Sequence, residues 1–130
     1  MNTYIVDTHA LLWYVSGDKR LSKKAESALD SDNSFLIIPT VVLAELVYLF
    51  NKHRVTIPLT KIMNYLRSDP RCTVHPFDLS CVEILPRDLN LHDAMIVSVG
   101  LLIRNTLDAD TSIITKDKDI RDSRLIKTIW

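Results

Sequence analysis

The chain contains 130 residues, 47% of them hydrophobic and 25% charged, with sixteen basic and sixteen acidic side chains and a formal net charge of zero. This length and composition predict one folded domain, residues 1–130, and exclude a disordered or low-complexity protein. The balanced charge disfavours a simple nucleic-acid-binding module, because such a module neutralises many phosphates with Lys and Arg.

The sequence also carries signals about compartment. No apolar stretch approaches the roughly 20 residues that span a bilayer, and the first residues lack the pattern of a secretion signal. Cys72 and Cys81 lack the CxxC spacing of a zinc site, so both are predicted to be reduced thiols in packed positions. We therefore expect a cytoplasmic protein without a membrane partner.

The first element is a short β-branched and aromatic run that ends at Asp7 and passes directly into an apolar helical segment, residues 10–15. Asp7 is thus predicted at the carboxyl end of a strand, where open α/β sheets bind ligands. Thr8 and His9 supply polar groups at the same turn. The alternative is that Asp7 only caps the helix, and this stretch alone does not choose between the two.

A second helix is predicted after Ser22, followed by a buried strand over 35–38 that Pro39 stops. Thr40 is predicted to cap the next helix, residues 41–50, which is apolar all round and should therefore be buried on most of its surface. Glu45 is its one charged residue. A buried carboxylate needs a cation or a partner, so Glu45 is either a site residue or the partner of Lys52 or Arg54.

Residues 59–66 have helical periodicity, and Cys72–His75 form a predicted strand, which Asp78 follows as the cap of a short helical segment. A long amphipathic helix then runs from Leu91 to Leu107 with His92 and Asp93 in its first turn. Asp93 is either a second site carboxylate or a complement to the helix dipole. His92 is predicted to be structural, because no HxxxH or HxH pattern accompanies it.

Residues 108–110 form a predicted connection to a fourth buried strand, residues 112–115, and a short last strand covers 125–129. Between these strands, Asp117 and Asp119 lie in a Lys-Asp-Lys-Asp run that taken alone would be a solvated turn. The order of elements predicts a parallel sheet covered by helices on both faces.

In such a sheet the strand ends on one side share a crevice, so Asp7 and Asp117 should meet there with Glu45 and Asp93. Carboxylates that converge without cations repel each other, and the convergence therefore implies a divalent metal. Oxygen ligands without His or Cys favour Mg²⁺ or Mn²⁺ over zinc. A metal-dependent nuclease fits the balanced charge better than a simple binding module, because the bound metal adds positive charge where a phosphate must lie.

These segments resemble the PIN-domain ribonucleases, and among them the VapC-type toxins of toxin–antitoxin pairs. The resemblance rests on Ile5–Trp13, on Thr40 with Leu43–Leu46, on His92–Ile96 and on Ile113–Asp119, and it covers essentially the whole chain. It implies a three-layer α/β/α domain that binds Mg²⁺ or Mn²⁺ and cleaves RNA by metal-activated water. Whether one or two metals take part stays open.

Position by position, the resemblance makes Asp7, Glu45 and Asp93 the three central catalytic acids and metal ligands, and Asp117 the fourth. Asp119 is a further candidate ligand, and Thr8, Thr40 and Thr115 are candidate supporting hydroxyls. Phosphate contacts are expected from the basic residues near the pocket rim, Lys116, Lys118, Arg121 and Arg124.

The resemblance also implies partners: an RNA substrate, a cognate antitoxin with a basic inhibitory segment, and a second copy of the chain in a homodimer. Two alternatives are a solitary RNA-processing nuclease and a PIN-like interaction module without catalysis. A phosphorylated receiver domain fits poorly, because the third predicted strand ends at His75-Pro76 without an aspartate.

Overall fold

The computed structural model describes residues 1–107 and 110–130; residues 108 and 109, in the predicted connection before the fourth strand, lie outside the described residues. The described residues form a five-stranded sheet in the order β3-β2-β1-β4-β5, and each neighbouring pair is parallel. The prediction of a parallel sheet is therefore confirmed. The strands are β1 (Asn2–Val6), β2 (Ser34–Pro39), β3 (Cys72–His75), β4 (Asp110–Ile114) and β5 (Lys127–Ile129).

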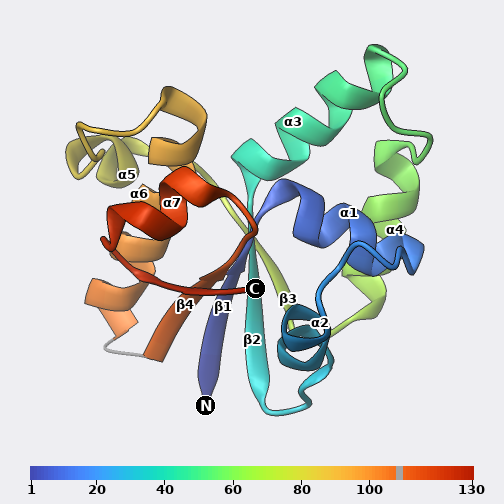
Figure 1. Ribbon diagram of the computed structural model, residues 1–130, viewed down its shortest axis with the longest axis horizontal. Helices are drawn as coiled ribbons and strands as arrows, with labels where there is room; N and C mark the ends of the chain where they lie inside the picture. Colours follow the sequence, from blue (N-terminus) through green and yellow to red (C-terminus); the bar gives the residue numbers. More distant parts are fainter. Residues whose placement is uncertain (108–109) are drawn as a thin grey trace.

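Helices cover both faces of this sheet (Figure 1): α5, α6 and α7 lie on one side, and α1, α2 and α4 lie on the other. The predicted three-layer α/β/α arrangement is confirmed. The helices are α1 (Thr8–Ser16), α2 (Lys23–Asp30), α3 (Thr40–Asn51), α4 (Leu59–Ser68), α5 (Leu79–Glu83), α6 (Leu91–Leu107) and α7 (Lys118–Ser123). Within the described part of the chain, none is long and apolar enough to cross a membrane.

The core lies where the central strands pack against the helices. Ile5, Val6, Ile113 and Ile114 are fully buried, and Val6 pairs with Ile114 at the carboxyl ends of β1 and β4. Such unbroken apolar runs are typical of parallel strands covered on both faces. The core therefore holds the carboxyl ends of β1 and β4 side by side.

Two predicted helix caps, Ser22 and Thr40, can be compared with the structure. Ser22 caps α2 as predicted, since its Oγ accepts from the N–H of Ala25 at 3.1 Å. The predicted cap at Thr40 is wrong, because Pro39 takes the cap position and Thr40 is already the first helical residue. The Thr40 hydroxyl instead accepts from the N–H of Phe77 at 3.1 Å, which ties α3 to the connection after β3.

Helix α3 is also less buried than its apolar sequence predicts. Only Val42, Leu46 and Leu49 are buried, while the side chain of Tyr48 is 55% exposed. The helix rises beyond the carboxyl edge of the sheet (Figure 1), so only its inner face has neighbours to pack against. The prediction that this helix is buried on most of its surface is therefore wrong.

The segment after β4 is not the solvated turn that its charges predict. Residues 118–123 form α7, which Asp117 caps by accepting from the N–H of Ile120 at 3.0 Å. Ile120 is fully buried. A single apolar residue among charged neighbours thus anchors a short helix at the carboxyl edge of the sheet.

Arg71 links the other edge of the sheet to α2. Its Nη1 donates to the carbonyl oxygens of Leu29 and Ser31 at 2.6 and 2.7 Å, and its Nη2 donates to Asp69 at 2.8 Å. The guanidinium group of Arg71 therefore links the carboxyl end of α2 to the residues just before β3.

Candidate active site

Asp7 stands at the end of β1, between β2 and β4, and its side chain has two partners. One carboxylate oxygen accepts from the N–H of Thr8 at 2.7 Å, and the other accepts from the hydroxyl of Thr115 at 2.5 Å. The backbone N–H of Asp7 donates to Ile114, which continues the sheet by one residue. Asp7 therefore caps α1 and also presents a carboxylate at the sheet edge. The two alternatives for Asp7, helix cap and ligand-site residue, are thus compatible.

Burial is the main cause that raises the pKa of Asp7, and the hydrogen bonds from Thr115 and Thr8 oppose it. The Glu45 carboxylate raises the pKa of Asp7 further. Burial also raises the pKa of Asp93, and the negative charges of Asp117 and Asp7 add to this effect. The four predicted acids thus lie close enough to share one electrostatic environment at the carboxyl edge of the sheet.

The tightest group of carboxylates is the acidic cluster, which we define as Asp93, Asp117 and Asp119. One carboxylate oxygen from each lies within 4.8 Å of the other two. Asp93 comes from the first turn of α6, Asp117 caps α7, and Asp119 lies in its first turn. Their exposure rises from buried Asp93 to exposed Asp119. Among the described residues, this cluster has the spacing needed to hold a metal ion.

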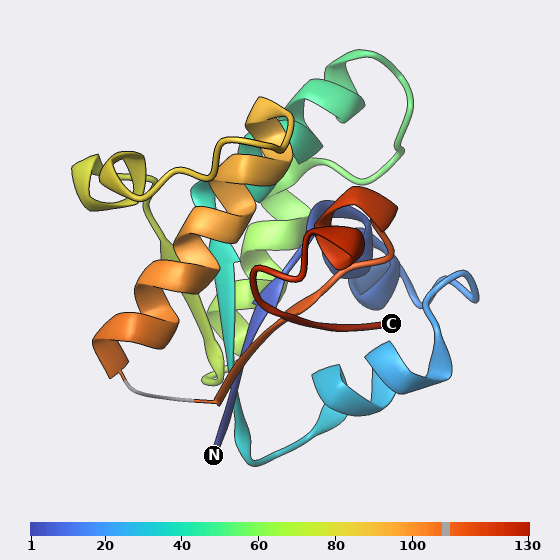
Figure 2. The same cartoon turned by 60° about the vertical axis from the view of Figure 1, so that its left-hand side comes forward.

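Glu45 lies outside this cluster. Its Oε2 is 2.7 Å from Nε2 of His92, and both side chains are 31% exposed. This contact joins α3 to the amino end of α6, which lies next to α3 (Figure 2). The partner of Glu45 is therefore His92, and not Lys52 or Arg54 as in the structural alternative.

His92 and Asn90 each contact one of the predicted acids, and the sequence did not predict either contact. The amide nitrogen of Asn90 donates to Oδ2 of Asp93 at 2.7 Å, and its amide oxygen accepts from the backbone N–H of Asp93 at 2.9 Å. An Asn directly before an apolar periodic run is a helix-cap signal, so this contact could have been foreseen. No comparable signal marked the Glu45–His92 contact, because the two residues meet only through the tertiary fold.

The three predicted hydroxyls differ in position. Thr115 bridges two acids, since its Oγ1 donates to Asp7 and accepts from the backbone N–H of Asp117 at 2.9 Å. Thr8 is buried next to Asp7, and its hydroxyl has no hydrogen-bond partner among the described residues. Thr40 contacts the backbone of Phe77. Thr115 is therefore the hydroxyl with direct contacts to two of the predicted acids.

The predicted basic residues lie on and around α7. Lys118 forms an ion pair with Asp122 at 2.6 Å, while Arg121 is exposed and Arg124 ends the helix in a left-handed conformation. Lys116 lies with its Nζ 4.8 Å from the ring centre of Trp13.

The indole of Trp13 is the centre of a cluster of aromatic and basic side chains next to the site. The Arg20 guanidinium carbon lies 4.9 Å from its ring centre, and the rings of His9 and Trp130 lie 5.3 and 5.9 Å away. Lys116 and Arg20 thus both make cation–π contacts with Trp13, and Arg20 also forms an ion pair with Asp18 at 2.7 Å.

The arrangement suits a hard divalent cation. Several carboxylates meet at one sheet edge, two of them with raised pKa values, and a bound cation would compensate their charge. The N–H of Thr8 and the hydroxyl of Thr115 donate to the Asp7 carboxylate, and the N–H of Ile120 donates to the Asp117 carboxylate, as outer partners orient ligands in metal sites.

Comparison with known proteins agrees with the fold. The model of the PIN domain matches residues 4–124. A crystal structure of VapBC2 from Rickettsia felis bound to a DNA fragment from their promoter is similar, with a TM-score of 0.61 and 16% identity over 97% of this chain and 96% of that chain. The comparison with curated protein sequences gave no match. At 16% identity the structural likeness shows the fold alone, but the family match covers nearly the whole chain, and the protein belongs to the PIN domain family.

Proposed function

We propose that the protein is an endoribonuclease dependent on Mg²⁺ or Mn²⁺ and that it is the toxin of a type II toxin–antitoxin pair. The observation that carries the nuclease proposal is the acidic cluster, whose carboxylate oxygens lie within 4.8 Å of one another. The charge of Asp7 acts on Asp93, and the charge of Glu45 acts on Asp7. Few structural roles require so many acids at one edge of a sheet, because their mutual repulsion opposes folding.

The donor set fits the proposed metals. Mg²⁺ and Mn²⁺ prefer oxygen ligands, and Mg²⁺ sites usually combine a few carboxylates with water and phosphate oxygens. Asp7, Glu45, Asp93 and Asp117 would hold the metal, with Asp119 as a further ligand. Glu45 can join them by exchanging its contact with His92 for the cation.

A bound cation would supply a water of lowered pKa and would neutralise negative charge on the phosphate. A carboxylate of the cluster, Asp117 or Asp93, would accept the proton of the attacking water. The Thr115 hydroxyl keeps Asp7 in place, and Asn90 does the same for Asp93. Neighbouring phosphates would be bound by the exposed basic residues near the site, Lys116, Lys118, Arg121 and Arg124.

The toxin assignment is supported by the similarity to the VapBC2 structure, which contains a promoter DNA fragment. The site offers a chemical route to inhibition. An Arg or Lys from a basic antitoxin segment could bind the carboxylates, compete with metal and block the phosphate position. We further propose that the protein acts in the cytoplasm as a homodimer.

The test of the nuclease proposal is a cleavage assay on a mixed RNA substrate with Mg²⁺ or Mn²⁺, and with EDTA as the metal-free arm. We expect cleavage by the wild-type protein only with metal and none by Glu45→Gln. Glu26→Gln, which removes a carboxylate from α2, serves as the matched control and should retain activity. RNA degradation that persists with EDTA and in Glu45→Gln would contradict the proposal.

The toxin proposal has a separate test. Induced expression in a bacterial host should arrest growth with the wild-type protein and not with Glu45→Gln. A host that grows normally while the purified protein cleaves RNA would favour a solitary processing nuclease instead.

A further inference from the structure

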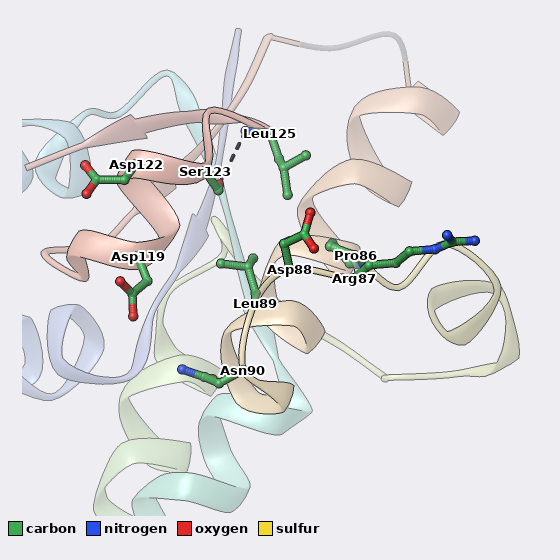
Figure 3. A pocket seen from close by; sticks show the side chains of 9 residues that line it. All are labelled: Pro86, Arg87, Asp88, Leu89, Asn90, Asp119, Asp122, Ser123 and Leu125. Carbon is green, nitrogen blue, oxygen red and sulfur yellow. Dashed lines mark hydrogen bonds between the residues drawn. The ribbon is translucent and has the colours of Figure 1, made fainter.

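A pocket of about 660 Å³ lies between the connection before α6 and the segment that contains α7 (Figure 3). Its volume falls in the range of about 300–1,000 Å³ that is typical of ligand sites. The residues that line it are Pro86, Arg87, Asp88, Leu89, Asn90, Asp119, Asp122, Ser123 and Leu125.

This pocket adjoins the acidic cluster. Asp119 belongs to both, and Asn90, which lines the pocket, holds the Asp93 carboxylate at 2.7 Å. An RNA strand with a phosphate at the cluster would therefore place an adjacent nucleotide at this pocket.

The lining combines apolar surface with hydrogen-bond acceptors. In Figure 3, the side chain of Leu89 points into the gap toward α7, and the Asp88 carboxylate points toward Leu125. Leu125 is 40% exposed, so part of its side chain is available to a ligand. Arg87 points away from the gap.

The charge of the lining excludes a phosphate as the main occupant. Asp88, Asp119 and Asp122 line the pocket, and of these only Asp122 forms an ion pair with a described residue, Lys118. The one basic lining residue, Arg87, points outward. A flat neutral group that packs on leucine side chains and donates hydrogen bonds to a carboxylate fits better. Nucleobases of single-stranded RNA are such groups, and proteins commonly bind them through their splayed-out Watson–Crick edges.

Building on the ribonuclease function proposed above, we propose that this pocket binds the base next to the cleaved phosphate and selects guanine through the Asp88 carboxylate. Guanine presents two neighbouring donors, N1–H and N2–H, that one carboxylate can accept together. Uracil presents a single N–H between two carbonyl oxygens, which an acidic lining repels. Leu89 and Leu125 supply the apolar surface on which the base rests.

The first experiment maps cleavage sites on a single-stranded RNA of random sequence with Mg²⁺. Wild-type protein should favour guanine over uracil by about fivefold or more at one position beside the cut, as one carboxylate–base contact provides. Asp88→Asn should remove this preference, and Leu125→Ala should weaken it with a raised KM. The matched controls are Asp32→Asn, at the opposite edge of the sheet, and Leu79→Ala, an exposed leucine on α5.

The second experiment does not require cleavage. Guanosine or uridine 5′-monophosphate is titrated into the protein in the presence of Mg²⁺. The guanosine nucleotide should shift the NMR signals of residues 86–90 and 123–125 at a lower concentration than the uridine nucleotide. Absence of cleavage by the wild-type protein together with these shifts would refute the nuclease proposal and retain the pocket.

Cleavage without a base preference, or a preference that Asp88→Asn leaves unchanged, would overturn the pocket proposal and retain the nuclease. Equal shifts with both nucleotides would also overturn the proposed selection of guanine.

Discussion

Asn90 combines two functions that substitution can separate. Its amide oxygen caps α6, and its amide nitrogen orients the Asp93 carboxylate at 2.7 Å. Asn90→Ala removes both, so the free energy of unfolding should fall by about 1 kcal/mol. Asn90→Ser restores the cap but not the amide donor, and its stability should come close to wild type. Both variants should bind Mn²⁺ about tenfold more weakly, as is usual when a partner of a metal ligand is lost.

The assays are urea unfolding followed by circular dichroism and calorimetric titration of Mn²⁺. Ser22→Ala is the matched control, because Ser22 caps α2 without contacting any carboxylate of the site. It should lose about 1 kcal/mol of stability and keep wild-type Mn²⁺ affinity. If Asn90→Ser bound Mn²⁺ as tightly as wild type, the orienting function of the amide would be refuted.

Asp7→Asn should abolish Mn²⁺ binding in calorimetry and, without metal, leave stability unchanged or raise it. Burial raises the pKa of Asp7, so wild-type stability should fall as pH rises through the window above the unfolded value of about 3.9, and the variant should lack that fall; a clearly lower metal-free melting temperature for Asp7→Asn would show a mainly structural carboxylate. Asp69→Asn should cost about 1–2 kcal/mol at pH 7, because the Arg71 guanidinium lowers the pKa of Asp69. That contribution is present above about pH 3.9 and is lost as pH falls through the lower folded pKa, so urea unfolding curves of both proteins should converge in strong acid. Gly17→Ala should lose about 1 kcal/mol, because Gly17 has a φ of 65° while an added Cβ would meet nothing within 4 Å; thermal unfolding that is unchanged would contradict this origin.

The sequence predicted the sheet, because apolar runs that stop at Pro or Asp mark buried parallel strands. It also predicted that Asp7, Glu45, Asp93 and Asp117 would converge, since the carboxyl ends of such strands share one edge. Asp93 and Asp117 do lie together, Asp7 acts on Asp93 electrostatically, and Glu45 instead contacts His92. Whether these acids bind metal remains a prediction.

The errors have physical causes. The charged segment 118–123 forms α7 because Asp117 caps it and Ile120 buries its side chain. Local composition alone shows four charged residues in this segment and therefore favours a solvated turn. The apolar helix α3 was predicted to be enclosed, but burial depends on which neighbours reach each face. The Glu45–His92 contact joins residues 47 positions apart, so no local pattern contains it.

The packing of Trp13 has a practical consequence. Its indole is 3% exposed and lies 5.9 Å from the ring of Trp130, and these two tryptophans are the only ones in the sequence. Lys116, which contacts the Trp13 ring, directly follows the threonine that holds Asp7. Movement of Lys116 toward a phosphate would therefore change the fluorescence of Trp13 and the near-ultraviolet circular dichroism of the tryptophan pair. The protein thus contains an intrinsic optical probe beside its carboxylates, and ligand binding can be followed without an added label.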